Sequence, residues 1–324
     1  MKIAVMGAGA LGGYFGGRLA QGGHEVSLIA RGAHLAAMRA GGLRITSPGG
    51  DAHVTNIIAT DDPTSVGPVD VVLFMVKNRD VEDAARAIRP MLGPDTMVLT
   101  CQNGVTAHER LGAVIGEDRV LPGVARIPAS VPEPGHVLHD SDFNTLVFGE
   151  VDGRVSDRCQ RLADALNDSP GASAIQSEAI ISDLWAKFCS QSSLASLTTL
   201  TGLDIGPLRE TPDSAGLFRD AIAEACAVAA KAVPGFPDTA LDQYWGFIQK
   251  LPATMHASML DDLRAGKPLE NDYLSGEVVR QGALHGVPTP IHSVLYAALK
   301  PVADRLDPAA GATPCLLYTS DAAD

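Results

Sequence analysis

A glycine-rich segment near the amino terminus has the spacing of a phosphate-binding loop. Its glycines follow the pattern G-x-G-x-x-G, in the residues Gly7, Ala8, Gly9, Ala10, Leu11 and Gly12. In such a loop the first glycine permits a tight turn, the second lets the backbone approach a pyrophosphate, and the third allows close packing of helix on strand. The N–H groups at the start of the following helix then face the phosphates. These residues therefore indicate binding of a dinucleotide.

The residues on both sides of this loop are typical of a strand, a helix and a second strand. Residues 2–6 are almost all apolar and form the first expected strand, and residues 24–30 form the second. Between them Leu11, Phe15 and Leu19 recur at helical spacing. The glycine pattern alone is weak, since a glycine-rich turn would also produce it. A βαβ unit of about 30 residues around it makes it specific.

The residue after the second expected strand indicates which dinucleotide binds. Enzymes that use NAD usually place an acidic residue there, bonded to the ribose 2′-hydroxyl. In this chain the position holds Arg31. A guanidinium can form two parallel hydrogen bonds with a 2′-phosphate. We therefore expect NADP(H) as the cofactor; a solvated surface charge is the alternative for Arg31.

Two more polar residues follow expected strands in the same way. Residues 69–76 form a nearly continuous apolar run, typical of a strand buried on both faces of a parallel sheet, and Lys77 follows them. Residues 96–100 form the next strand, and Asn103 comes shortly after it. Ligands of open α/β sheets bind beside the carboxyl ends of the strands. We expect Lys77 to contact a ribose or phosphate and Asn103 to hold the nicotinamide or the substrate, although Asn-Gly is also a common turn pair.

Composition and charge indicate a globular protein and argue against nucleic-acid, metal and membrane partners. A chain of 324 residues is long enough for two domains, and 46% hydrophobic residues indicate a globular protein. A net charge of −13 argues against a nucleic-acid partner. The five cysteines lack C-x-x-C spacing, so we expect free thiols, a cytoplasmic location and no metal site. No apolar run is long enough to span a membrane, so no membrane partner is expected.

The order of the expected elements predicts an α/β fold. A Rossmann-type parallel-sheet domain, residues 1–173, is followed by an all-α domain, residues 174–314. Additional short strands are expected in the first domain at residues 43–46, 54–59, 120–125, 136–138 and 145–149, with helices at 34–40, 81–91 and 155–166. Helices are expected in the second domain at residues 182–201, 218–233, 258–264, 269–284 and 291–299.

The last residues, 315–324, differ in character from the rest. Their sequence, CLLYTSDAAD, corresponds to a translation of the transposase adapter used in sequencing libraries. We interpret them as read-through that is not native. The nucleotide sequence around codon 315 tests this interpretation.

Four segments taken together resemble the ketopantoate reductase (2-dehydropantoate 2-reductase) family. They are the glycine-rich loop with Arg31, Lys77 with the triplet 102–104, the segment 185–188 around Lys187, and the segment 258–263 with Glu270 beyond it. The resemblance covers almost the whole chain, to about residue 301. It implies NADPH-dependent reduction of a 2-oxo acid, by default 2-dehydropantoate to pantoate in pantothenate and coenzyme A biosynthesis. A monomer or homodimer is expected.

The resemblance also implies roles for individual residues. Lys187 matches the family's catalytic lysine, which protonates the carbonyl oxygen as hydride reaches the carbon. Glu270 is expected to act in catalysis and to hold the cofactor ribose, a substrate hydroxyl or Lys187 itself. Ser258, Asn103 and Lys187 are expected to contact the substrate. The alternatives are a surface lysine and a glutamate placed to stabilise a helix start.

The chain departs from the family in the expected substrate pocket. Better-known members carry substrate-binding asparagines four and eight residues beyond the lysine, and here those positions hold Gln191 and Ala195. We expect Gln191 to bind substrate, yet the particular 2-oxo acid stays open, and a different branched 2-oxo acid is an alternative. A non-catalytic NADP(H) sensor is another, but it would need Arg31 without Lys187 or Glu270.

Overall fold

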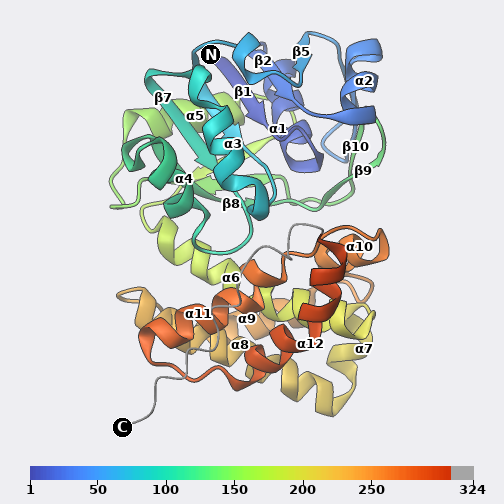
Figure 1. Ribbon diagram of the computed structural model, residues 1–324, viewed down its shortest axis with the longest axis vertical. Helices are drawn as coiled ribbons and strands as arrows, with labels where there is room; N and C mark the ends of the chain where they lie inside the picture. Colours follow the sequence, from blue (N-terminus) through green and yellow to red (C-terminus); the bar gives the residue numbers. More distant parts are fainter. Residues whose placement is uncertain (308–324) are drawn as a thin grey trace. The chain divides into compact units, whose positions relative to one another are not determined.

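The structure, a computed structural model, describes residues 1–307 and divides into two compact units (Figure 1). The first unit comprises Met1–Lys187, and the second begins at Phe188. The boundary expected at residue 173 falls at an edge strand of the first unit's sheet, residues 173–176, and the first unit continues to Lys187. The adapter-like residues 315–324 lie outside the described part of the chain.

The first unit is built on an eight-stranded sheet in which neighbouring strands are parallel except β11 and β8. β1, β2, β6, β7 and β8 run in one direction, so their carboxyl ends meet at one edge of the sheet. The spatial order is β12 (Ser173–Gln176), β11 (Thr145–Phe148), β8 (Val120–Arg126), β7 (Leu92–Thr100), β6 (Val69–Phe74), β1 (Lys2–Met6), β2 (Glu25–Ile29) and β5 (Ile57–Thr60).

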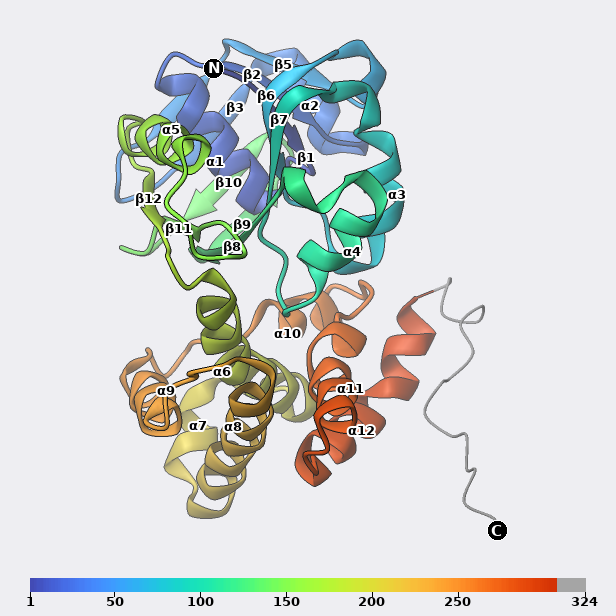
Figure 2. The ribbon, with the colours of Figure 1, turned by 90° about the vertical axis from the view of Figure 1, so that its left-hand side faces the viewer.

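Helices cover both faces of this sheet, as Figure 2 shows for α1 and α5 on one side and α3 and α4 on the other. The side chains of β1 alternate accordingly: Ile3 and Val5 pack with α1 and α5, while Ala4 and Met6 pack with α3 and α4. The central strands are therefore apolar on both faces. The helices of this unit are α1 (Ala10–Gln21), α2 (Gly32–Gly41), α3 (Val81–Ala87), α4 (Ala107–Ile115) and α5 (Asp157–Asn167).

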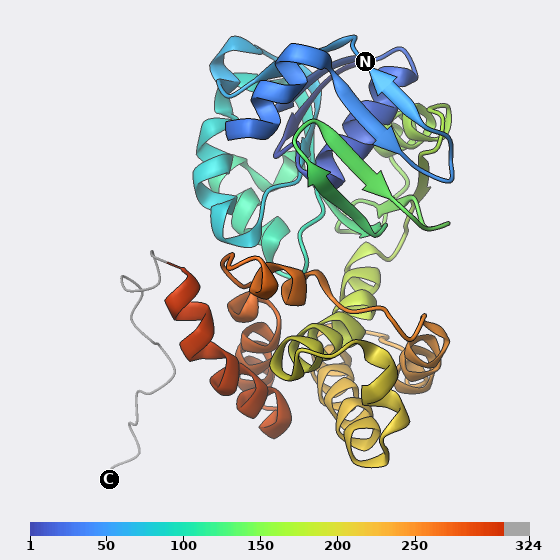
Figure 3. The same ribbon diagram turned by 90° about the vertical axis from the view of Figure 1, so that its right-hand side faces the viewer.

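A second, four-stranded sheet packs against α1 in the same unit; Figure 3 shows its blue and green strands. The strand expected at residues 54–59 proves to be two strands in different sheets, because the chain turns at Asn56, whose side-chain amide donates to the Ala20 carbonyl at 2.9 Å. The order is β4 (Ala52–Val54), β3 (Leu43–Thr46), β10 (His136–His139) and β9 (Ala129–Glu133).

The second unit is helical throughout its described residues. Its first helix, α6, begins at Ile180 within the first unit and ends at Thr201. The others are α7 (Ile205–Glu210), α8 (Pro212–Ala232), α9 (Ala240–Lys250), α10 (Ser258–Arg264), α11 (Ser275–His285) and α12 (Pro290–Leu306). An α/β domain followed by a helical region is thus confirmed. In residues 1–307 no helix has the length and apolar character needed to cross a membrane.

Two expected helices differ from the structure in instructive ways. The helix expected at residues 269–284 is interrupted at Leu274, whose φ of −113° and ψ of −98° are not helical. The helix expected at residues 81–91 ends at Ala87 as α3, because Pro90 cannot donate the backbone hydrogen bond that a continuous helix needs. The short 3₁₀ turns of the chain are η1 (Pro63–Ser65), η2 (Asn78–Asp80), η3 (Arg89–Met91), η4 (Glu117–Arg119) and η5 (Asn271–Tyr273).

Candidate functional site

Two glycines of the 7–12 loop are required by the fold itself. Gly7 has a φ of +94°, and a Cβ added there would lie 2.9 Å from the carbonyl oxygen of Met75. At Gly12 an added Cβ would collide with the Gly7 carbonyl oxygen and would lie 2.8 Å from Val5 Cγ1. The first glycine thus turns the chain out of β1, and the last lets α1 pack closely against that strand.

Neither backbone conformation nor packing within the protein requires a glycine at position 9, so a bound ligand is the remaining reason for one. It precedes α1 directly, its φ is −81°, and no side chain caps the helix there. A Cβ added at Gly9 would meet no protein atom within 4 Å. The space in front of the helix start is therefore open on the protein side, as close approach of a pyrophosphate requires. Ala8 is anchored behind it, its N–H donating to the Ile29 carbonyl at 2.9 Å.

Arg31 lies at the same edge of the sheet. It comes just after β2, has an extended backbone (φ −136°, ψ 163°) and precedes the first residue of α2. Its side chain is exposed. Gly32, with a φ of +59°, turns the chain from this position into the helix. The guanidinium is therefore accessible to a ligand beside the carboxyl end of β2.

Hydrogen bonds join the two loops that carry Lys77 and Asn103. The side-chain amide of Gln102 donates to the carbonyls of Phe74 at 2.8 Å and Val76 at 3.0 Å, which ties the end of β7 to the end of β6. The Asn78 side chain donates to the Asn103 carbonyl at 2.7 Å. Gln102 and Asn78 are almost fully buried. Asn78 was not an expected site residue, and Gln102 was expected only as part of the triplet 102–104; each lies beside an expected site residue.

Lys187 and Asn103 are brought together by the fold, although they are far apart in the sequence. Lys187 lies on α6, and its ammonium donates to Asn103 Oδ1 at 3.0 Å and to the Ala125 carbonyl, near the end of β8, at 3.1 Å. Both acceptors are neutral oxygens. The ammonium is therefore held at the carboxyl edge of the sheet, which also carries the glycine-rich loop.

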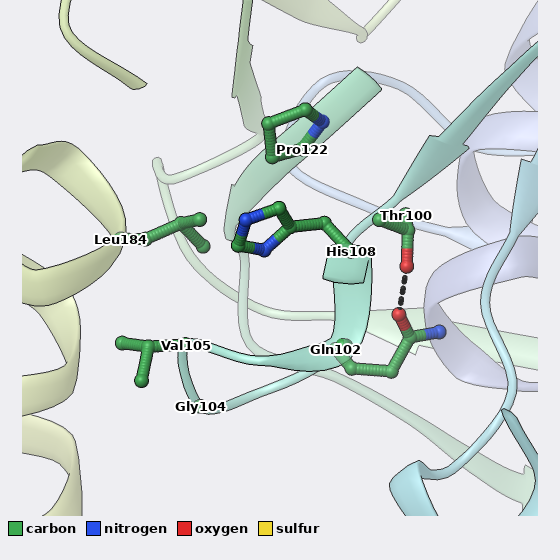
Figure 4. Close-up of a pocket in the computed structure, with 9 residues that line it drawn as sticks. Thr100, Gln102, Gly104, Val105, His108, Pro122 and Leu184 are labelled. Carbon is green, nitrogen blue, oxygen red and sulfur yellow. Dashed lines mark hydrogen bonds between the residues drawn. The ribbon is translucent and has the colours of Figure 1, made fainter. Parts of the chain in front are cut away.

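A small cavity borders the residues 102–104 (Figure 4). His108 projects among its lining groups, and burial lowers the pKa of His108 to about 4. The imidazole is therefore neutral at pH 7 and adds no charge to this part of the first unit. The lining residues are Thr100, Gln102, Gly104, Val105, Ala107, His108, Pro122, Gly123 and Leu184.

Three expected site residues belong to the second unit. Gln191 lies one helical turn beyond Lys187 on α6 and is half-buried. Ser258 is exposed and begins α10. Glu270 is buried and immediately precedes η5. Gln191 and Ser258 thus lie on helices of this unit, and Glu270 lies in the segment before η5.

Buried polar contacts within the second unit fix the helices that carry these residues. Ser275 Oγ lies 2.6 Å from Ser196 Oγ on α6 and 3.0 Å from His292 Nδ1 on α12. His256 bridges two carboxylates, Asp204 at 2.8 Å and Asp261 at 2.9 Å, and so holds α10. The serine-rich composition of α6 was the visible sequence signal for the first of these networks.

Comparisons with known proteins identify the family of the chain. The family model "Ketopantoate reductase PanE/ApbA" matches residues 3–153, and the model of its C-terminal domain matches residues 179–303. A 2-dehydropantoate 2-reductase of Mesorhizobium japonicum is 31% identical, with 94% of this chain and 98% of that protein covered.

Solved structures are similar over the same extent. A PanE/ApbA family ketopantoate reductase of Ralstonia eutropha is 34% identical and superposes with a TM-score of 0.86, with 94% of this chain and 99% of that chain covered. D-mandelate dehydrogenase, 24% identical, shares the fold with a TM-score of 0.84, with 94% and 99% covered. With both family models matched across most of its length, the chain belongs to the ketopantoate reductase family of oxidoreductases.

Proposed function

We propose that this chain reduces a 2-oxo acid to a 2-hydroxy acid with NADPH, with 2-dehydropantoate as the default substrate. The observation that carries the proposal is the position of Lys187. Its ammonium is fixed by Asn103 and Ala125 at the sheet edge that also carries the dinucleotide-binding loop. A cation held there suits a reaction in which negative charge develops on a carbonyl oxygen.

Lys187 has two tasks in this reaction. Its positive charge stabilises the carbonyl oxygen as that oxygen becomes negative, and its N–H supplies the proton that completes the hydroxyl group. Asn103 positions the ammonium through its side-chain oxygen at 3.0 Å and contacts the substrate or the nicotinamide. Asn103 Oδ1 and the Ala125 carbonyl are neutral, so these two contacts orient the ammonium without cancelling its charge.

The residues of the first unit fit a bound dinucleotide. The open space at Gly9 and the start of α1 receive the pyrophosphate, and Arg31 binds the 2′-phosphate. Lys77 and Glu270 complete the proposed cofactor contacts, as the family resemblance implies. When bound, NADPH supplies the hydride for the carbonyl carbon.

The substrate itself is the less defined part of the proposal. Asn103, Lys187, Gln191 and Ser258 are the proposed substrate contacts. Ala195, which stands where other members have an asparagine, is fully buried and offers no polar group. This favours a second candidate, the same reduction of a different branched 2-oxo acid, in which Gln191 supplies the amide.

The experiment that tests the proposal measures NADPH oxidation by its absorbance against a panel of 2-oxo acids that includes 2-dehydropantoate. We expect turnover with at least one branched 2-oxo acid, and the preferred member decides between the two candidate substrates. NADPH binding without turnover of any member of the panel would favour the sensor alternative and contradict the proposal.

A further inference from the structure

A second cation lies next to the groups that hold Lys187. Arg126 is the last residue of β8 and directly follows Ala125, whose carbonyl accepts the hydrogen bond from Lys187. Its side chain is 50% exposed. Arg126 is not among the residues that the family resemblance implies. Of the proposed substrate contacts, only Lys187 carries a charge. The end of β8 therefore carries one cation, Arg126, next to the carbonyl that accepts from a second cation, Lys187 of α6.

One face of α6 contacts the last two residues of β8, Ala125 and Arg126. Asp183 and Lys187 are four residues apart on this helix, so their side chains lie on one face. Lys187 reaches the carbonyl of Ala125, and Asp183 Oδ1 lies 3.8 Å from a terminal guanidinium nitrogen of Arg126. One strand end and one helix face thus make the contacts of both Arg126 and Lys187, all within the first unit.

The contact with Asp183 leaves the donors of Arg126 available. At 3.8 Å it is an ion pair that is too long for a hydrogen bond. The other oxygen of Asp183 is already engaged, because it accepts from Ser177 Oγ at 2.6 Å. Within residues 1–307 the guanidinium of Arg126 forms this ion pair and donates no side-chain hydrogen bond. The contact with Asp183 therefore leaves the planar N–H fork of Arg126 unused.

We propose that Arg126 binds the carboxylate of the 2-oxo acid and so selects acids over uncharged ketones. This inference rests on the proposed function. In a 2-oxo acid the carboxylate is bonded directly to the reacting carbonyl carbon. A substrate whose carbonyl oxygen meets Lys187 therefore presents its carboxylate to the immediate surroundings of that ammonium. A guanidinium matches a carboxylate with two parallel hydrogen bonds.

The test compares Arg126→Ala with wild type in steady-state kinetics on an accepted 2-oxo acid, with NADPH affinity measured separately by fluorescence. Loss of a charged hydrogen-bonding partner should raise KM by about tenfold to hundredfold. The affinity for NADPH and the rate of hydride transfer at saturating substrate should change much less. Inhibition by oxamate, an unreactive analogue of a 2-oxo acid, should weaken in the same proportion. Arg126→Lys keeps the charge without the fork, so its KM should fall between the two.

Two control variants separate substrate binding from a structural role. Asp183→Asn removes the same ion pair but keeps the guanidinium, so KM should stay at the wild-type value or fall. Arg219→Ala removes a similarly exposed arginine, 45% against 50%, from a surface pair with Asp242, and should leave KM unchanged.

The outcomes distinguish failure of this inference from failure of the proposed function. If wild type reduces a 2-oxo acid and Arg126→Ala has the same KM, Arg126 is not the carboxylate site. If Arg126→Ala weakens NADPH instead, or if Asp183→Asn raises KM equally, the inference is likewise overturned while the reductase function stands. A wild-type chain that reduces no 2-oxo acid overturns both.

Discussion

At the scale of single residues, the ammonium of Lys187 donates to Asn103 Oδ1 and to the Ala125 carbonyl at the sheet edge proposed to bind the cofactor. We expect Lys187→Ala to lower the rate of hydride transfer by about 10²–10⁴-fold, because the proton donor and the charge partner of the carbonyl oxygen are lost together. NADPH should still bind, because the glycine-rich loop is unchanged. Stopped-flow measurement of hydride transfer, with NADPH affinity from fluorescence, checks both expectations.

Lys187→Arg is the matched control for this variant. A guanidinium keeps the positive charge but is a very poor acid near neutral pH. Arginine should therefore restore substrate affinity more than it restores the rate. Wild-type hydride transfer in Lys187→Ala would show that another group supplies the proton, with Glu270 or a water molecule as the next candidates.

Arg31 is exposed at the end of β2, so its replacement should affect ligand binding more than stability. Arg31→Ala should weaken NADPH binding by about tenfold to hundredfold, the cost of one charged hydrogen-bonding partner. NADH lacks the 2′-phosphate, and its affinity should change little. Dissociation constants for both cofactors test the prediction. Equal losses would mean that Arg31 does not select between them.

At the scale of elements, the turn from β1 into α1 provides two glycines with opposite requirements. Gly12→Ala should lower the free energy of unfolding by about 1–3 kcal/mol, because its Cβ would collide with the Gly7 carbonyl and with Val5. Gly9→Ala should leave that free energy nearly unchanged, since no protein atom lies within 4 Å of the added carbon. Urea unfolding of both variants measures the difference.

NADPH affinity provides the second half of this comparison. Gly9→Ala places a methyl group where the pyrophosphate is proposed to bind, so NADPH affinity should fall although the protein is as stable as wild type. Unaltered NADPH binding in Gly9→Ala would contradict the proposed position of the pyrophosphate. A stability loss as large as that of Gly12→Ala would contradict the open space described in front of α1.

At the scale of the whole molecule, stability should depend on pH through a buried histidine. His292 is fully buried, and burial lowers its pKa from 6.5 to about 4. Its neutral ring accepts or donates hydrogen bonds with Ser275 at 3.0 Å and with the Ala221 carbonyl at 3.0 Å, which joins α11, α12 and α8. His292 must stay neutral for this packing to persist.

The direction of the pH effect follows from these two pKa values. Between pH 6.5 and about 4 the unfolded chain binds a proton at His292 and the folded chain does not, so stability is lost as the pH falls through this window. The contribution of this one group amounts to about 2 kcal/mol between pH 7 and pH 5. Urea unfolding followed by circular dichroism at the two values measures this loss together with that from His108, whose pKa burial also lowers to about 4. Equal stability at pH 7 and pH 5 would show that His292 is not buried as a neutral group.

Local sequence determined much of the first unit. The glycine spacing at residues 7–12 predicts a tight turn and a closely packed helix, and the φ of +94° at Gly7 and the crowding around Gly12 show both. Apolar runs located the central strands, because a strand buried on both faces has few polar positions. The motif around Lys187 directed attention to the residue that the fold then placed beside Asn103.

Only the tertiary structure decided which distant groups meet and where chain elements break. The division of residues 52–60 between two sheets depends on strand partners elsewhere in the chain, as does the edge strand β12. The sequence does not show that Gln102 joins β7 to β6, or that Arg126 follows a residue whose carbonyl accepts from Lys187. The physical reason is that backbone preferences act over a few neighbouring residues, whereas a site is assembled by long-range packing. Its geometry therefore exists only once the sheet and its helices have formed.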